Sequence, residues 1–207
     1  MTLRKAPQDK PPPSRDRVLA AAERLLGEGR ADFSMRDLAA AAEVSFATPF
    51  NLFGSKLSIM RALSAARIER MHADANAAPL APDAPERVLE VVAIAVRVMT
   101  ARPEVNRAVM GAIGAPGGEP GDARERSRSL WRAALGEGRG LAAEHRSLAL
   151  SLLPDQLANG FRGVLSFWTA GEIDDDGLRT QARTVAATLL LGFVEPEARR
   201  RLAETLR

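Results

Sequence analysis

The apolar residues of this chain recur at helical spacing over most of its length, and the recurrence is sharpest just after residue 33. Four of them occupy positions i, i+3, i+4 and i+7 and therefore share one face of a short helix: Met35, Leu38, Ala39 and Ala42. Ser34 precedes this helix and can accept a hydrogen bond from its free amides, and Asp37 can return the bond. The pattern predicts a capped helix that begins at Met35.

A second short helix is predicted from about Phe46 to Phe53, because Ser45 offers a new cap and Gly54 suits a left-handed C-terminal residue. The connection between the two helices is only a few residues long, which forces the steep crossing angle of helix-turn-helix units. Pro49 falls close to the first turn, where its missing amide costs at most one bond. These features predict a DNA-binding helix-turn-helix whose second helix faces outward.

Helical patterning continues on both sides of this pair. A first helix is predicted from Ser14 to about Glu28, and a longer helix from Lys56 toward Met71. Phe33 is expected to fill the gap between the first helix and the two that follow, completing a three-helix core. Residues 1–13 form a basic, proline-rich tail, which is either a disordered leader or an arm that reaches DNA phosphates or the minor groove.

The remainder of the chain predicts a second helical domain after a proline-rich break over residues 77–85. Helices are expected over residues 88–99, 103–113, 122–137, 154–169 and 174–193. The last two are joined by a turn and are each apolar over more than one face, which indicates more than one packing partner. We assign residues 14–71 to a DNA-binding domain, residues 72–207 to a C-terminal domain and residues 1–13 to the tail.

Composition indicates a globular protein without a membrane segment, and the charge distribution adds little to the expectation of DNA binding. A 46% hydrophobic chain of 207 residues can bury a core, and the absence of cysteine fits a reducing cytoplasm. The longest apolar run, residues 185–194, is about half of the roughly 20 residues that span a bilayer. Residues 1–71 carry 12 Lys/Arg and 8 Asp/Glu, whereas residues 72–207 carry 17 and 18. A phosphate-binding surface gives such an asymmetry, although an excess this small also arises by chance.

Catalytic and metal-binding patterns are missing from the sequence. The two histidines, His72 and His145, have no partner at metal-ligand or triad spacing, and no HExxH motif, glycine-rich phosphate loop or nucleophile elbow occurs. The acidic run at residues 174–176 lacks the spacing of a calcium loop, so we expect it to cap a helix. We therefore expect no enzyme activity, no cofactor and no metal.

The segment from residue 44 to residue 56 carries a recognisable order of residue types: Val44, Ser45, Ala47, Thr48, Phe53 and Lys56. This order resembles the DNA-binding domain of the tetracycline-repressor (TetR) family of bacterial transcriptional regulators, and the resemblance extends over roughly residues 14–71. Three residues depart from the family's pattern: Pro49 replaces an aliphatic residue, Phe50 a tyrosine and Leu52 a polar ring. The phenylalanine lacks the hydroxyl with which that tyrosine commonly touches phosphate.

The resemblance implies an all-α protein with an N-terminal three-helix DNA-binding domain and a C-terminal helical domain for ligand binding and dimerisation. It also implies a homodimeric repressor in the cytoplasm, which binds a palindromic operator in double-stranded DNA and is controlled by a small hydrophobic effector. The alternative is a helical interaction module that uses the same fold without sequence-specific DNA binding.

The expected DNA surface divides into positioning and reading residues. Four polar residues at helix starts or just beyond the second helix are expected to contact phosphates: Ser34, Arg36, Thr48 and Lys56. Phe46, Ala47 and Asn51 are the candidates for base edges, and Asn51 can pair with adenine through two hydrogen bonds. The surface is completed by Ser45, Phe50 and Leu52.

Two further sites are expected in the C-terminal domain. Bulky or pliable apolar residues are either the lining of a ligand pocket or ordinary core: Met99, Met110, Trp131, Phe161, Leu165 and Trp168. In the TetR family the final long helices form a four-helix dimer interface, which assigns six residues here: Phe161, Val164, Trp168, Val185, Leu189 and Phe193. A monomeric core hairpin is the alternative.

Overall fold

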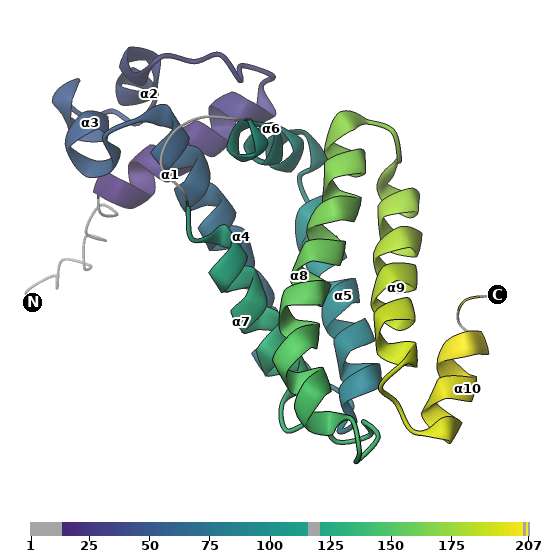
Figure 1. The fold of residues 1–207 in the computed structure, drawn as a ribbon. Coiled ribbons are helices and arrows are strands. Elements are labelled where there is room, and N and C mark those ends of the chain that lie inside the picture. Colours follow the sequence, from purple (N-terminus) through teal and green to yellow (C-terminus); the bar gives the residue numbers. More distant parts are fainter. Residues whose placement is uncertain (1–13, 116–120, 205, 207) are drawn as a thin grey trace, which may run out of the picture. The chain divides into compact units, whose positions relative to one another are not determined.

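A computed structural model describes residues 14–115, 121–204 and 206, and the predicted basic tail at residues 1–13 lies outside them. The elements of the described residues are helices (Figure 1): α1 (Ser14–Gly27), α2 (Met35–Ala41), α3 (Ala47–Phe53), α4 (Lys56–Ala77), α5 (Ala84–Thr100), α6 (Pro103–Gly114), α7 (Ala123–Leu135), α8 (Arg146–Ala170), α9 (Asp175–Leu191) and α10 (Pro196–Glu204). An isolated antiparallel bridge joins Leu141 to Val194. The all-α prediction is confirmed.

The described residues divide into two compact units, one ending at Ile59 and the other beginning at Met60. The division falls within α4, which continues across it. The predicted domain ranges, 14–71 and 72–207, stay a prediction.

The first unit is a three-helix core in which α1 packs against both α2 and α3. Phe33 is 3% exposed between them, as the sequence predicts. Arg17 and Arg24 of α1 donate to the carbonyls of Glu43 and Ala41, each at 2.6 Å. These carbonyls lie at and just beyond the C-terminus of α2, where backbone oxygens lack helical partners, so the two arginines fix α2 on α1.

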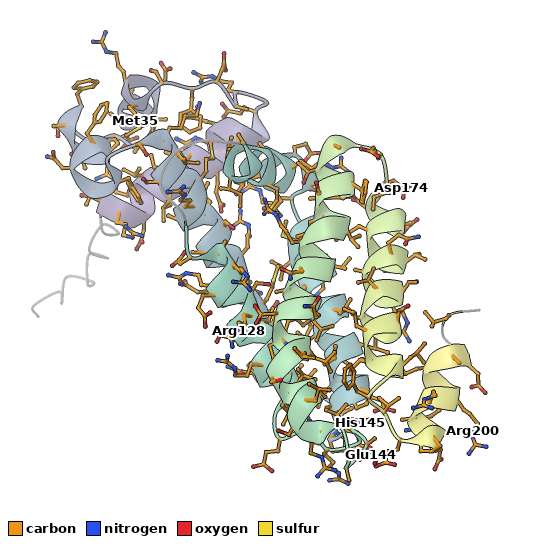
Figure 2. The ribbon with its side chains drawn as sticks, viewed as in Figure 1. Met35, Arg128, Glu144, His145, Asp174 and Arg200 are labelled. Carbon is orange, nitrogen blue, oxygen red and sulfur yellow. The ribbon has the colours of Figure 1, made fainter. Side chains whose placement is uncertain are left out.

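The second unit is a helical bundle. α8 packs against α7 and α9, and α5 packs against the same two helices, so that the four helices enclose a common core. α6 covers part of α8 and α5, and α10 lies on α9. Asp174 accepts a hydrogen bond from the Gly177 amide at 2.7 Å and caps α9 (Figure 2). The cap predicted for the acidic run is confirmed.

The start of α8 differs from the prediction. The sequence predicts a helix that begins at Pro154, but α8 begins at Arg146 and Pro154 is buried inside it. Leu153 and Ala149, on the earlier turns, are buried in the same core. Their burial outweighs the cost of one missing backbone hydrogen bond, which is why the helix continues through the proline.

The contact between α8 and α9 depends on a glycine. A Cβ atom added at Gly160 would lie 2.5 Å from Cγ1 of Val185, so no larger residue fits without movement of one helix. Gly163, one turn further along α8, has no such neighbour within 4 Å. The two glycines of this helix therefore have different roles.

Candidate DNA-binding surface and ligand cavity

The start of α2 is fixed by a reciprocal cap between Ser34 and Asp37. The Asp37 amide donates to Oγ of Ser34 at 3.1 Å, and the Ser34 amide donates to Oδ2 of Asp37 at 2.8 Å. The backbone and hydroxyl hydrogen bonds from Ser34 lower the pKa of the Asp37 carboxyl below its ordinary value of 3.8. The capping box predicted from the sequence is confirmed, and α2 begins after it at Met35 (Figure 2).

The turn between α2 and α3 passes through a left-handed residue that is not glycine. Glu43 has a φ of 53°, and its side chain is exposed. Its carbonyl is held by Arg17, as described above, and the Val44 amide donates to the carbonyl of Ala39 at 3.0 Å. The hydrogen bonds keep the turn tight despite the strain at Glu43.

The start of α3 differs from the prediction in one respect. Ser45 does not cap the helix through its hydroxyl, which instead forms a hydrogen bond of 2.7 Å with the hydroxyl of Thr48. The Thr48 amide donates to the Ser45 carbonyl at 2.9 Å, and α3 begins at Ala47 rather than Phe46. The carbonyl therefore takes the place of the predicted side-chain cap.

The outer face of α3 is aromatic and uncharged. Phe46 is 54% exposed and Phe50 43% exposed, and their rings make an edge-to-face contact with centroids 5.7 Å apart. The guanidinium of Arg36 lies 5.5 Å from the Phe46 ring centroid. None of the residues Ala47–Phe53 carries a charge. The surface has the chemistry to contact base edges and thymine methyl groups rather than phosphates.

The inner face of α3 is anchored by a proline. Phe53 is only half-buried, with the guanidinium of Arg15 4.8 Å from its ring centroid. Pro49 is the buried residue of α3, and it lies in the first turn, where its missing amide removes no helical bond. An unusual residue in the family pattern is thus the one that fastens the helix to its unit.

Lys56 holds the loop before α2. Its ammonium group donates to the carbonyls of Ala31 and Phe33 at 2.7 and 2.9 Å, and it lies 4.3 Å from the Phe33 ring centroid. Partial burial lowers the pKa of Lys56, and the charge of Asp32 acts in the opposite direction. These contacts give Lys56 a structural role that the sequence did not suggest, and its expected phosphate contact stays a prediction.

The residues expected at DNA come together around α3. Most of them are exposed: Ser34, Arg36, Ser45, Phe46, Ala47, Phe50, Asn51 and Leu52. Thr48 and Lys56 are half-buried. Asn51 is the exposed amide of α3, and it adjoins Phe50 in sequence. Their assignment to DNA stays a prediction.

The second unit contains a cavity of about 340 Å³ between α4, α5, α6, α7 and α8. Four of the six residues expected at a pocket line it: Met99, Met110, Phe161 and Leu165. The other two do not. Trp131 is fully buried and packs edge-to-face on Phe161, and Trp168 is fully buried with its indole N–H donating to Asp175 at 2.7 Å. The two tryptophans build the core behind the cavity wall, and ligand binding by the other four stays a prediction.

The cavity also has polar lining residues that sequence reasoning missed. Arg162 lies on α8 next to Phe161, and Asn106 is 2% exposed on α6. The Asn106 amide group donates to the carbonyls of Val98 and Met99 at 3.2 and 2.7 Å, and its oxygen accepts from Nε of Arg67 at 2.8 Å. The available signal was an asparagine and an arginine on otherwise apolar helix faces.

The residues expected at a dimer interface fall into two groups. Phe161, Val164 and Trp168 are buried inside the chain's own core. Val185, Leu189 and Phe193 are partly buried and pack against that core. The large apolar side chains that α8 leaves exposed are different ones: Leu148, Leu152 and Phe167. The dimer itself stays a prediction.

The described part of the chain offers neither a metal site nor a membrane span. Residues 14–115, 121–204 and 206 contain no cluster of three or more His, Cys, Asp or Glu side chains placed to hold a metal ion. Within the same ranges, no helix combines the length and apolar character that crossing a bilayer requires.

Comparison with known proteins shows similarity at the level of the fold. No protein-family model matches the sequence, and no curated protein matches it significantly. A TetR transcriptional regulator from Rhodococcus sp. RHA1 superimposes with a TM-score of 0.66 at 23% identity, over 86% of this chain and 96% of that chain. A putative transcriptional regulator from Streptomyces coelicolor A3(2) superimposes with a TM-score of 0.53 at 21% identity, over 87% and 96%. The chain therefore has the fold of TetR transcriptional regulators.

Proposed function

We propose that this protein is a DNA-binding transcriptional regulator that acts as a homodimeric repressor in the cytoplasm and is released from DNA by a small molecule. The observation that carries the proposal is the exposed face of α3 in a capped helix-turn-helix, where Phe46, Phe50 and Asn51 project from a rigid three-helix unit. Such a helix presents apolar and amide contacts suited to base edges in the major groove.

The phosphate contacts come from residues around α3, because α3 itself is uncharged. Arg36 is exposed at the start of α2, and Ser34 and Thr48 supply hydroxyls close to helix N-termini. These groups position the unit on the duplex, and the exposed side chains of α3 then read the sequence.

Two copies of the chain are needed to read a palindrome. We assign the dimer contact to the exposed apolar side chains of α8 together with Val185 and Leu189 of α9. Phe167 is 54% exposed there, and Gly163 leaves open space on the same helix for a close approach. Two three-helix units then dock on half-sites at a fixed distance.

The assignment of the dimer is tested by light scattering on Phe167→Glu and Leu189→Arg. Both substitutions place a charge in the proposed contact, so they should give monomers at micromolar concentration while wild type is a dimer. Ala133→Glu, on the exposed face of α7, is the control and should stay dimeric. A monomeric wild type would overturn the dimer.

DNA binding is tested by fluorescence titration with a duplex selected by the protein from a random library, at two salt concentrations. A regulator should bind this duplex far more tightly than random DNA, and its affinity should fall steeply with salt.

The second candidate, a protein-interaction module, is favoured by the aromatic and uncharged face of α3. Binding that is weak on every duplex would support this second candidate.

A further inference from the structure

The cavity of the second unit combines an apolar wall with an excess of positive charge. Its charged lining residues are four arginines and one aspartate: Arg61, Arg67, Arg124, Arg162 and Asp122. Apolar side chains from α4, α5, α6, α7 and α8 form most of the rest, including Met71, Met99, Phe161 and Leu165, and the uncharged polar lining residues are Ser64, Asn106, Ser127 and Asn159. A purely hydrophobic ligand would offer these guanidinium groups no hydrogen-bond acceptor. The presence of the arginines in the lining therefore has to be explained separately.

Most of this charge is already engaged by the protein. Arg124 forms an ion pair of 2.7 Å with Asp155, and Nε of Arg67 donates to Asn106. Arg61 also interacts with another group of the protein, so it is not free either. Asp122 is paired with Arg126 at 2.7 Å and does not neutralise the cavity.

Arg162 is the exception. Its hydrogen bond within the described residues runs from Nη1 to the sulfur of Met110, 3.6 Å away, and no carboxylate in the described residues forms an ion pair with it. The residue is exposed overall, but the surrounding protein atoms still desolvate the guanidinium and lower its pKa. An arginine stays protonated under these conditions. The site thus holds a partly desolvated cation whose Nη1 faces a weak sulfur acceptor and whose Nη2 lies beside Gly114 of α6.

The apolar groups next to Arg162 complete an amphipathic site. Ala158 and Leu165 share its face of α8, because they lie four residues before it and three residues after it, and Phe161 lines the same cavity. Met110 faces it from α6. At about 340 Å³, the cavity is near the lower end of the range of roughly 300–1,000 Å³ typical of small-molecule sites, which suits a short chain rather than a large ring system.

We propose that the cavity binds an amphipathic anion, with a carboxylate on the guanidinium of Arg162 and a short apolar body against Met99, Phe161 and Leu165. The proposal rests on the regulatory function argued above and names the chemical class of its effector. A carboxylate accepts two parallel hydrogen bonds from a guanidinium, which the sulfur of Met110 does not. The positive charge of Arg162 and the apolar lining together favour an amphipathic anion over neutral and cationic molecules of the same length.

The test is calorimetric titration of the full chain, without DNA, with three probes of one chain length below their micellar concentrations: decanoate, decan-1-ol and decylammonium. Decanoate should bind at least tenfold more tightly than decan-1-ol, and decylammonium should not bind. Arg162→Gln should weaken decanoate about tenfold or more and leave decan-1-ol unchanged. Arg162→Lys should recover part of the loss, because it restores the charge but not the two parallel hydrogen bonds.

Arg183→Gln, on the exposed face of α9, is the matched control and should bind decanoate as wild type does. Circular dichroism on each variant separates loss of binding from loss of fold. Equal binding of decanoate and decan-1-ol, no binding of decanoate, or an unchanged decanoate affinity in folded Arg162→Gln would each overturn the proposal. Because these titrations contain no DNA, their failure leaves the DNA-binding function standing, and failure of DNA binding leaves the titration result intact.

Discussion

The ammonium group of Lys56 lies over the ring of Phe33 and donates to the carbonyl of the same residue at 2.9 Å. Through this pair the first residue of α4 closes the loop that precedes α2. We expect Lys56→Ala to destabilise the chain by about 1–2 kcal/mol, because it removes a cation–π contact and two charged hydrogen bonds. Thermal unfolding measures the loss.

The same substitution also tests the phosphate contact expected of Lys56. If the third N–H of the ammonium group reaches a phosphate, Lys56→Ala should weaken binding to all sequences and reduce the slope of log affinity against log salt by about one. Lys56→Arg, which retains the charge, is the control. An unchanged slope at a temperature where the variant is folded would restrict Lys56 to its structural role.

Asn51 is the exposed amide of α3, the helix proposed to read the DNA sequence. We expect Asn51→Ala to cost about 1–3 kcal/mol on the selected duplex and little on random DNA, because only a base contact is lost. Asn76→Ala, on an exposed position of α4, is the matched control. Equal losses for Asn51→Ala on both kinds of DNA would show that Asn51 does not read sequence.

Glu43 and Gly54, on either side of α3, have positive φ angles of 53° and 72°. Glutamate is strained there and glycine is not. We expect Glu43→Gly to raise the free energy of unfolding by about 0.5–1 kcal/mol and Gly54→Ala to lower it by about 1 kcal/mol. Urea unfolding of the two variants gives both values, and a loss of stability in Glu43→Gly would show that its contact with Arg17 outweighs the strain.

Acid should weaken the cap of α2. The pKa of Asp37 is lowered by the hydrogen bonds from Ser34, so the folded chain binds this proton less tightly than the unfolded chain does. The stabilisation is fully present above the ordinary pKa of 3.8 and is lost as the pH falls through the lower folded value. We expect the fall in unfolding free energy between pH 7 and pH 3 to be smaller in Asp37→Asn and in Ser34→Ala than in wild type. Equal falls in all three proteins would contradict this expectation.

The packing of α8 on α9 is tested by the two glycines of α8. Gly160→Ala places a methyl group 2.5 Å from Val185 and should cost about 1–3 kcal/mol through overpacking. Gly163→Ala has open space around it within the chain and should preserve or raise stability, because alanine favours the helix. Urea unfolding compares the two, and equal effects would contradict the close approach.

Local chemistry made the first unit predictable from sequence. The cap at Ser34, the glycine at Gly54 and the burial of Phe33 each follow from neighbouring residues, and the structure has all three.

The second unit was harder to predict, because α8 and α9 are apolar on several faces and spacing alone does not say which face meets the chain's own core. Phe161 and Trp168 are therefore interior, whereas the exposed Phe167 went unassigned. Arg162 was missed for a related reason, since the cavity beside it is formed by helices distant in sequence.

The exposed rings of Phe46 and Phe50 have a thermodynamic consequence for the proposed binding to an operator. Docking of the exposed rings of Phe46 and Phe50 against DNA removes water from aromatic carbon, and such burial gives a negative change in heat capacity. The binding enthalpy must then become more favourable as the temperature rises, while the entropy gained from released water declines. Complex formation should change from entropy-driven in the cold to enthalpy-driven in warm solution.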